Sequence, residues 1–77
     1  MSTIIRTEYR NVNGSPRVTA KGAGKQRTTP LDLSKSSEWN HGNAAGELAL
    51  VLGLSWSENI GHDSNDSGTR HGFEWPA

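Results

Sequence analysis

Residues 3–21 read TIIRTEYRNVNGSPRVTAK, and most of the expected architecture follows from their alternation. Ile5, Thr7 and Tyr9 share one parity, and charged side chains occupy the positions between them. A two-residue period of this kind is typical of a half-buried strand. The turn signal Asn13-Gly14-Ser15-Pro16 follows, and a second alternating run continues beyond it. The stretch therefore predicts a β-hairpin with one apolar face and one cationic face.

Two registers keep the faces of this hairpin aligned. A two-residue loop at Asn13-Gly14 sets Arg10 opposite Arg17, whereas a four-residue loop sets Glu8 opposite Lys21. Like charges directly across a ladder destabilise it, and unlike charges stabilise it by roughly 0.2–1 kcal/mol. We therefore expect the four-residue loop.

The second run carries most of the remaining cations. Val18 and Ala20 fall on the apolar parity, and we expect the strand to fray or bulge at Gly22-Ala23-Gly24 and to end at Pro30. If residues 17–27 form one continuous strand, four cations lie on the face opposite Val18 and Ala20, namely Arg17, Lys21, Lys25 and Arg27.

The middle of the chain predicts an amphipathic helix over residues 37–53. Serines at its start offer N-cap hydroxyls, and Gly53 is a suitable stop. Because residues 40–43 are weak helix formers, a later start at Asn43 is the alternative. Four apolar residues follow the i, i+3, i+4, i+7 spacing of a buried stripe: Ala45, Leu48, Ala49 and Leu52. The expected fold class is α+β, with a small hairpin packed on one helix.

Residues 1–54 form the expected hairpin-helix domain, and residues 55–77 an acidic, irregular tail. The tail is rich in Gly, Ser, Asn and Asp before Phe73 and Trp75 near the end. These two aromatic side chains either anchor a partner or fold back onto the chain's own core.

The composition limits the class of protein. Seventy-seven residues form one small domain, and the 13 Leu, Ile, Val and Phe residues make only a thin core. The absence of cysteine excludes disulfides and thiolate metal sites. No apolar run approaches the ~18–20 residues that span a bilayer, so we expect no membrane partner and a cytoplasmic location.

Charge asymmetry is the main functional signal. The net charge is zero, yet the seven cations and two acids of residues 1–35 give +5, and the rest gives −5. Such asymmetry points to an anionic partner or a charged tail. The expected partner- or phosphate-binding residues are Arg10, Arg17, Lys21, Lys25, Arg27, Phe73 and Trp75.

Several chemical motifs are incomplete. Gly22-Ala23-Gly24-Lys25 lacks the first glycine and the final hydroxyl residue of a phosphate-binding loop. Residues 63–74 follow the spacing of an EF-hand calcium loop, but Arg70 interrupts it and no exit helix can follow. His41, His62 and His71 lack a helical i, i+4 ligand pair. We expect no metal, no cofactor and no enzymatic activity.

Two segments carry a family resemblance. Lys25-Gln26-Arg27-Thr28 and WNHGNAAG at residues 39–46 resemble segments of small proteins encoded by bacteriophages of actinobacteria, over residues 21–50. The resemblance implies a viral accessory protein that binds a host or viral protein or nucleic acid, and it assigns no functional residue.

The leading hypothesis is therefore a small non-enzymatic module that binds a larger host or viral protein, with self-association as an open alternative. The competing hypothesis is binding of DNA or RNA by the cationic face of the hairpin.

Overall fold

Two-residue turns join the first three strands of the computed structural model, which describes residues 2–76. The strands are β1 (Ser2–Val12), β2 (Ser15–Gly22) and β3 (Lys25–Pro30). Both central residues of each turn have positive φ: 52° and 81° at Asn13 and Gly14, and 50° and 76° at Ala23 and Gly24. Turns of this type match the right-handed twist of the strands that they join.

The hairpin register differs from the expected one, and the four-residue loop is wrong. Arg10 pairs with Arg17, and Arg6 pairs with Lys21. Repulsion between such exposed cross-strand pairs is worth at most about 1 kcal/mol. Glu8 reduces it further, because its carboxylate lies 3.1 Å from the Arg10 guanidinium. The twist match of the Asn-Gly turn therefore outweighs the repulsion.

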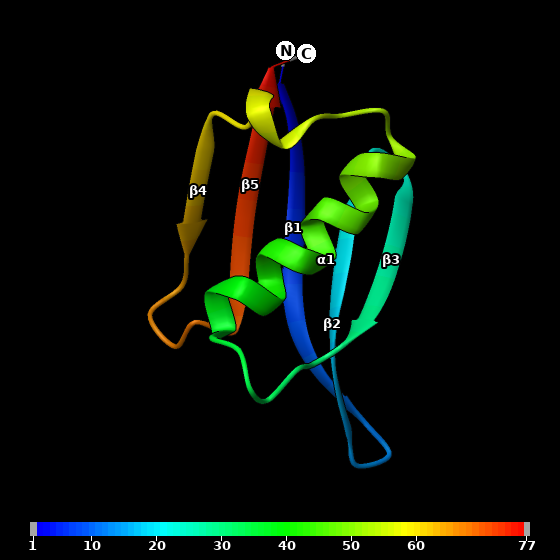
Figure 1. Cartoon of the computed structure of the whole chain (residues 1–77), viewed down its shortest axis with the longest axis vertical. Helices are drawn as coiled ribbons and strands as arrows, with labels where there is room; N and C mark the ends of the chain where they lie inside the picture. The colour runs from blue at the N-terminus through cyan, green and yellow to red at the C-terminus, as the bar shows by residue number, and fades with distance from the viewer. Residues whose placement is uncertain (1, 77) are drawn as a thin grey trace.

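The expected irregular tail is also wrong, because its residues complete the sheet. A 3₁₀ turn, η1 (Trp56–Glu58), leads into β4 (Gly61–Ser64) and β5 (Arg70–Pro76). β5 pairs with the second edge of β1, which gives the antiparallel order β3-β2-β1-β5-β4 (Figure 1). This pairing satisfies backbone groups that a lone hairpin would leave open. The protein is α+β, with a five-stranded sheet in place of the hairpin.

The helix α1 (Ser37–Val51) confirms the expected element at 37–53. Its N-cap is Ser36, whose hydroxyl accepts a hydrogen bond from the backbone N–H three residues on. Gly53 follows the C-cap with φ of 76°, a conformation that glycine adopts without strain. The later start at Asn43 is wrong. No helix in the described part of the chain is long and apolar enough to cross a membrane.

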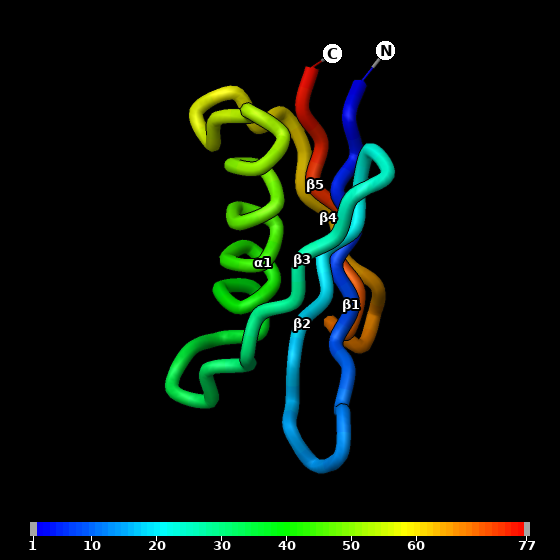
Figure 2. Tube along the Cα trace, turned by 90° about the vertical axis from the view of Figure 1, so that its right-hand side faces the viewer, coloured from blue at the N-terminus to red at the C-terminus, as the bar shows by residue number. Residues whose placement is uncertain are grey.

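The core lies between α1 and one face of the sheet (Figures 1 and 2). Val18 and Leu48 are fully buried, as expected, whereas Tyr9 remains 38% exposed. The Trp75 ring is fully buried, and its indole N–H donates to the Ser55 carbonyl at 2.8 Å. The buried apolar residues are Ile5, Val18, Ala20, Ala44, Ala45, Leu48, Ala49, Phe73 and Trp75.

The opposite face of the sheet is open. Seen from the side, α1 lies on one side of the strands, and no helix of residues 2–76 lies on the other (Figure 2). Antiparallel sheets commonly have one face on the core and one in water, so the open face must be judged by its side chains.

One hydroxyl group in the core interface is unsatisfied. Thr29 Oγ1 is buried and has no hydrogen-bond partner among residues 2–76. We expect Thr29→Val to raise the free energy of unfolding by about 1 kcal/mol, because it removes a desolvated polar atom. Urea denaturation measures the change. The matched control Thr28→Val, which removes a hydroxyl 3.3 Å from the Thr19 hydroxyl, should not stabilise. Equal effects of the two changes would contradict the assignment.

Candidate functional site

Two rows of cations lie on the open face, one behind the other along β1 and β2. Arg6 is directly opposite Lys21, and Arg10 is directly opposite Arg17. Successive side chains of a strand point to opposite faces, and the alternate residue Val18 is buried under the helix. The four cations therefore point away from α1 together. We refer to Arg6, Arg10, Arg17 and Lys21 as the cationic ribbon.

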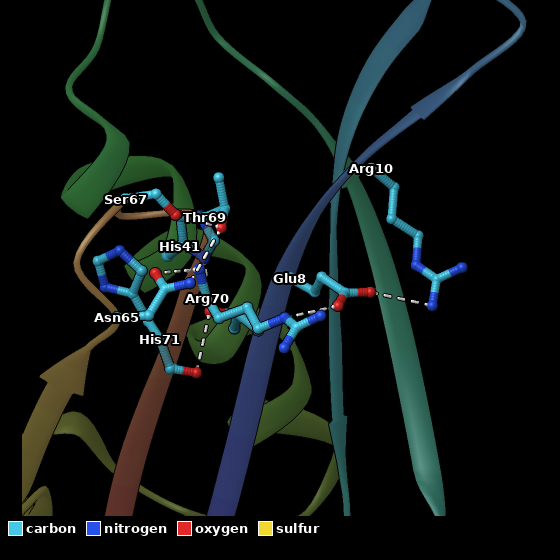
Figure 3. Close-up of polar contacts among 9 residues, drawn as sticks. Glu8, Arg10, His41, Asn65, Ser67, Thr69, Arg70 and His71 are labelled. Atoms are coloured by element: carbon cyan, nitrogen blue, oxygen red, sulfur yellow. Dashed lines mark hydrogen bonds and ion pairs between the residues drawn. The ribbon is translucent and has the colours of Figure 1, made fainter.

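Glu8 lies at the centre of this face between two arginines (Figure 3). Its Oε1 is 3.1 Å from Arg10 Nη2, and its Oε2 is 3.0 Å from Arg70 Nε. Exposed pairs of this kind are worth at most about 1 kcal/mol, so an incoming anion can replace the carboxylate at low cost.

The other three cations of the ribbon are not neutralised. Within residues 2–76, no carboxylate lies within ion-pair distance of Arg6, Arg17 or Lys21. The two like charges of each row thus remain directly opposite each other on the surface, and their repulsion destabilises the free protein slightly. A bound anion would relieve this repulsion.

The open face is hollowed and electrically uneven. A depression of about 820 Å³ lies on it, lined among others by Arg6, Glu8, Arg10 and Lys21. Acidic groups on the same face lie toward the β4 edge, where Asp63 pairs with Gly72 and Glu74 pairs with Gly61. The positive side of the face is therefore its β1–β2 half.

Lys25 and Arg27 do not join the cationic ribbon, so the prediction that they share its face is wrong. Arg27 pairs with Ala20, and Lys25 with Gly22, on the parity that faces the helix. The cause is the two-residue turn at Ala23-Gly24, which starts a new strand and reverses the parity count. Both side chains are exposed at the β3 edge of the sheet.

Phe73 and Trp75 are not available as anchors for a partner. Phe73 is 4% exposed and Trp75 is fully buried, so the fold-back alternative is the one that the structure adopts. Trp56 covers them at ring-centroid distances of 5.6 and 5.3 Å. Their role is to fill a thin core.

The calcium-loop spacing of residues 63–74 does not produce a calcium loop. Its first residue lies in β4, and its last five lie in β5. In the turn between them, the Thr69 hydroxyl accepts from the Asn65 amide at 3.1 Å and lies 2.8 Å from the Ser67 hydroxyl (Figure 3). In the described part of the chain, no group of three or more His, Asp or Glu side chains could hold a metal ion.

Three histidines distant in the sequence come together beneath the sheet. The rings of His41 and His71 stack with centroids 4.0 Å apart, and those of His62 and His71 stack at 5.0 Å. His41 Nδ1 is 2.6 Å from the Thr7 hydroxyl, and His62 Nε2 is 2.8 Å from His71 Nδ1. These contacts tie α1, β1, β5 and β4 together, so the cluster serves the fold rather than the open face.

Burial keeps the inner histidines neutral. The pKa of His41 is lowered from 6.5 to about 4, mainly by burial and in smaller part by the neighbouring His71 and His62. Burial is also the main cause of the lowered pKa of His71, whose Nε2 lies 3.2 Å from the Gly68 carbonyl. Protonation of either ring therefore opposes folding.

Sequence reasoning omitted Arg6 and Arg70 from the binding residues. Arg6 lies in the same row as Lys21, and Arg70 bonds Glu8 from the neighbouring strand. The signal for Arg70 is the alternation of residues 70–76, in which His71, Phe73 and Trp75 face inward.

No protein-family model, curated protein or solved structure matches the chain.

Proposed function

We propose that the protein is a non-enzymatic module that binds nucleic acid through the phosphate groups, using the open face of its sheet. The observation that supports this is the cationic ribbon. In each of its two rows, two cations stand directly opposite each other across β1 and β2, and among residues 2–76 Glu8 is the one carboxylate that pairs with a member of the ribbon. Phosphate contacts by lysine and arginine supply most of the affinity of sequence-tolerant nucleic-acid binding.

The makeup of the open face favours nucleic acid over a protein. The centre of a protein interface is enriched in aromatic side chains and in arginine, and it is depleted in the other charged residues. On this face, Ile4 and Val12 are the exposed aliphatic side chains of β1, and they are separated by the three charged residues at 6, 8 and 10. A polar face with a positive half fits a phosphate backbone better than an apolar partner.

A protein partner is the second candidate, because apolar side chains are exposed on the helical side. Trp39 and Trp56 are each 46% exposed, and Leu50 is 76% exposed. A host or viral protein that binds there would agree with the resemblance to small phage proteins.

The test is the salt dependence of binding to fluorescein-labelled 20-mers, namely a DNA duplex, an RNA duplex and single-stranded DNA. Four phosphate contacts predict a slope of log K against log salt of about −3.6 for duplex DNA. The affinity should then fall roughly 100-fold between ~0.05 and ~0.2 M salt. Fluorescence anisotropy measures it.

Matched double variants separate the cationic ribbon from charge in general. Arg6→Gln/Lys21→Gln should reduce the slope for duplex DNA by about 2, because it removes two phosphate contacts. Lys25→Gln/Arg27→Gln also removes two positive charges, but from the face of the sheet on which the helix packs. It should change the slope by less than about 0.5. Absence of salt-dependent binding to all three 20-mers, or equal losses in both variants, would contradict the proposal and leave the protein partner.

A further inference from the structure

The end of the β1–β2 hairpin stands free of the rest of the sheet. β5 pairs with β1 as far as Glu8, and β3 pairs with β2 from Arg17 onward. Residues 10–15 therefore form a two-stranded ribbon without a neighbouring strand on either side, and the Pro16 carbonyl accepts a hydrogen bond from the Leu31 N–H at 3.0 Å. Figures 1 and 2 show it projecting below the helix and the other strands.

The dimensions of this projection fit a groove. Strands lie about 4.8 Å apart, so a two-stranded ribbon is narrow enough for the major groove of B-form DNA, which is about 12 Å wide. The full five-stranded sheet is too broad to enter. Only the free end, residues 10–15, can lie inside the groove, and Arg17, which pairs with Pro30 of β3, would lie at its mouth.

The side chains of the projection suit both parts of a duplex. Arg10 and Arg17 stand at its base, and exposed Asn11, Asn13 and Ser15 follow toward its tip. Arginine bonds phosphates at the margin of the groove, and serine and asparagine bond bases or phosphates within it. The row of Arg6 and Lys21 lies four residues further back, about 13 Å along the strands, where the phosphates at the groove margin would lie.

The placement of the aromatic residues argues against single strands. Proteins that bind single-stranded nucleic acid stack bases on aromatic side chains. Here Tyr9, Phe73 and Trp75 have the inward parity of β1 and β5, while Trp39 and Trp56 lie on α1 and η1. None of the five aromatic residues is on the open face.

The grooves of RNA argue against an RNA duplex. The major groove of A-form RNA is deep and narrow, and side chains cannot read it. A projecting ribbon of this width cannot enter that groove, and the minor groove of A-form RNA is too shallow to hold it.

We infer that the ligand is duplex DNA and that residues 10–15 enter its major groove, with Arg6, Arg17 and Lys21 on the flanking phosphates. This inference rests on the proposed function and names the ligand of the same face.

The test compares affinities for the three 20-mers, with the duplexes of equal sequence, by anisotropy at ~0.1 M salt. We expect duplex DNA to bind at least about tenfold more tightly than the RNA duplex or the single strand. Ser15→Glu should weaken duplex binding at least about tenfold, because it places a negative charge in the groove. The control Ser57→Glu, on η1, should change it less than about threefold.

The outcomes separate the two proposals. Equal or tighter binding of the RNA duplex or the single strand overturns the duplex assignment and leaves nucleic-acid binding intact. Full affinity of Ser15→Glu for duplex DNA overturns insertion of the ribbon. Arg17→Gln is the second variant if Ser15→Glu does not fold, and it should weaken duplex binding at least about fivefold. Absence of binding to all three 20-mers overturns the proposed function as well.

Discussion

Trp75→Ala is expected to remove a large part of the free energy of unfolding, about 3–5 kcal/mol. The Trp75 ring is fully buried in the core between α1 and the sheet, and its indole N–H donates a hydrogen bond to the Ser55 carbonyl. Replacing a buried Trp by Ala costs about 3–5 kcal/mol. At roughly 0.05–0.15 kcal/mol per residue, a chain of this length has about 4–12 kcal/mol of total stability. Circular dichroism during urea denaturation measures the loss.

Trp39→Ala is the matched control for this prediction. Trp39 is 46% exposed on the helix, and the Lys35 ammonium lies 5.4 Å from the centroid of its ring. An exposed cation–π contact is worth about 0.5–1 kcal/mol, so this variant should remain folded. Similar losses in both variants would show that residues 70–76 are not part of the core.

Acid is expected to destabilise the protein by roughly 2–3 kcal/mol between pH 7 and pH 4.5, through His41 alone. The pKa of His41 is about 4 in the folded protein and 6.5 ordinarily. Below pH 6.5 the unfolded chain therefore binds a proton that the folded protein excludes. The contribution of His41 is complete above this pH and is lost as the pH falls toward 4. The lowered pKa of His71 acts in the same direction.

Urea denaturation at pH 7 and pH 4.5 measures this effect. His41→Leu should be less stable than the native protein at pH 7, because the Thr7 hydroxyl loses its 2.6 Å partner and keeps only the His71 carbonyl at 3.5 Å. It should nevertheless lose much less stability on acidification. An equal loss in both proteins would mean that carboxylates, rather than His41, determine the acid response.

Local signals were sufficient to predict the helix. Ser36 supplies the cap, and Gly53 supplies the left-handed residue after the last turn. The apolar spacing of Leu48 and its neighbours identified the buried side. Each of these features acts within a few residues, so no knowledge of the tertiary structure was needed.

The C-terminal strands could not be predicted from composition. Residues 57–72 have the polar makeup of a loop, and β4 is only four residues long. Their strand structure depends on the vacant edge of β1, about 60 residues earlier in the chain. The alternation of Phe73 and Trp75 with polar residues was the available signal for a strand. That signal is weak by itself, and the strand forms because it pairs with β1.

The candidate site was predicted in part. Arg10, Arg17 and Lys21 share the open face, as the two-residue period of their strands requires. Lys25 and Arg27 were misplaced because Ala23-Gly24 is a weak turn signal: alanine rarely adopts a φ of 50°. Arg70 was missed with its strand.

Binding of duplex DNA by the open face is tested most directly by a map of backbone amide shifts by NMR as duplex DNA is added to the native protein. We expect shifts concentrated at the cationic ribbon and in residues 10–17, with the exposed side of α1 unchanged. Shifts confined to α1 and η1, or none at a protein concentration well above ~0.1 mM, would show that this face does not bind duplex DNA.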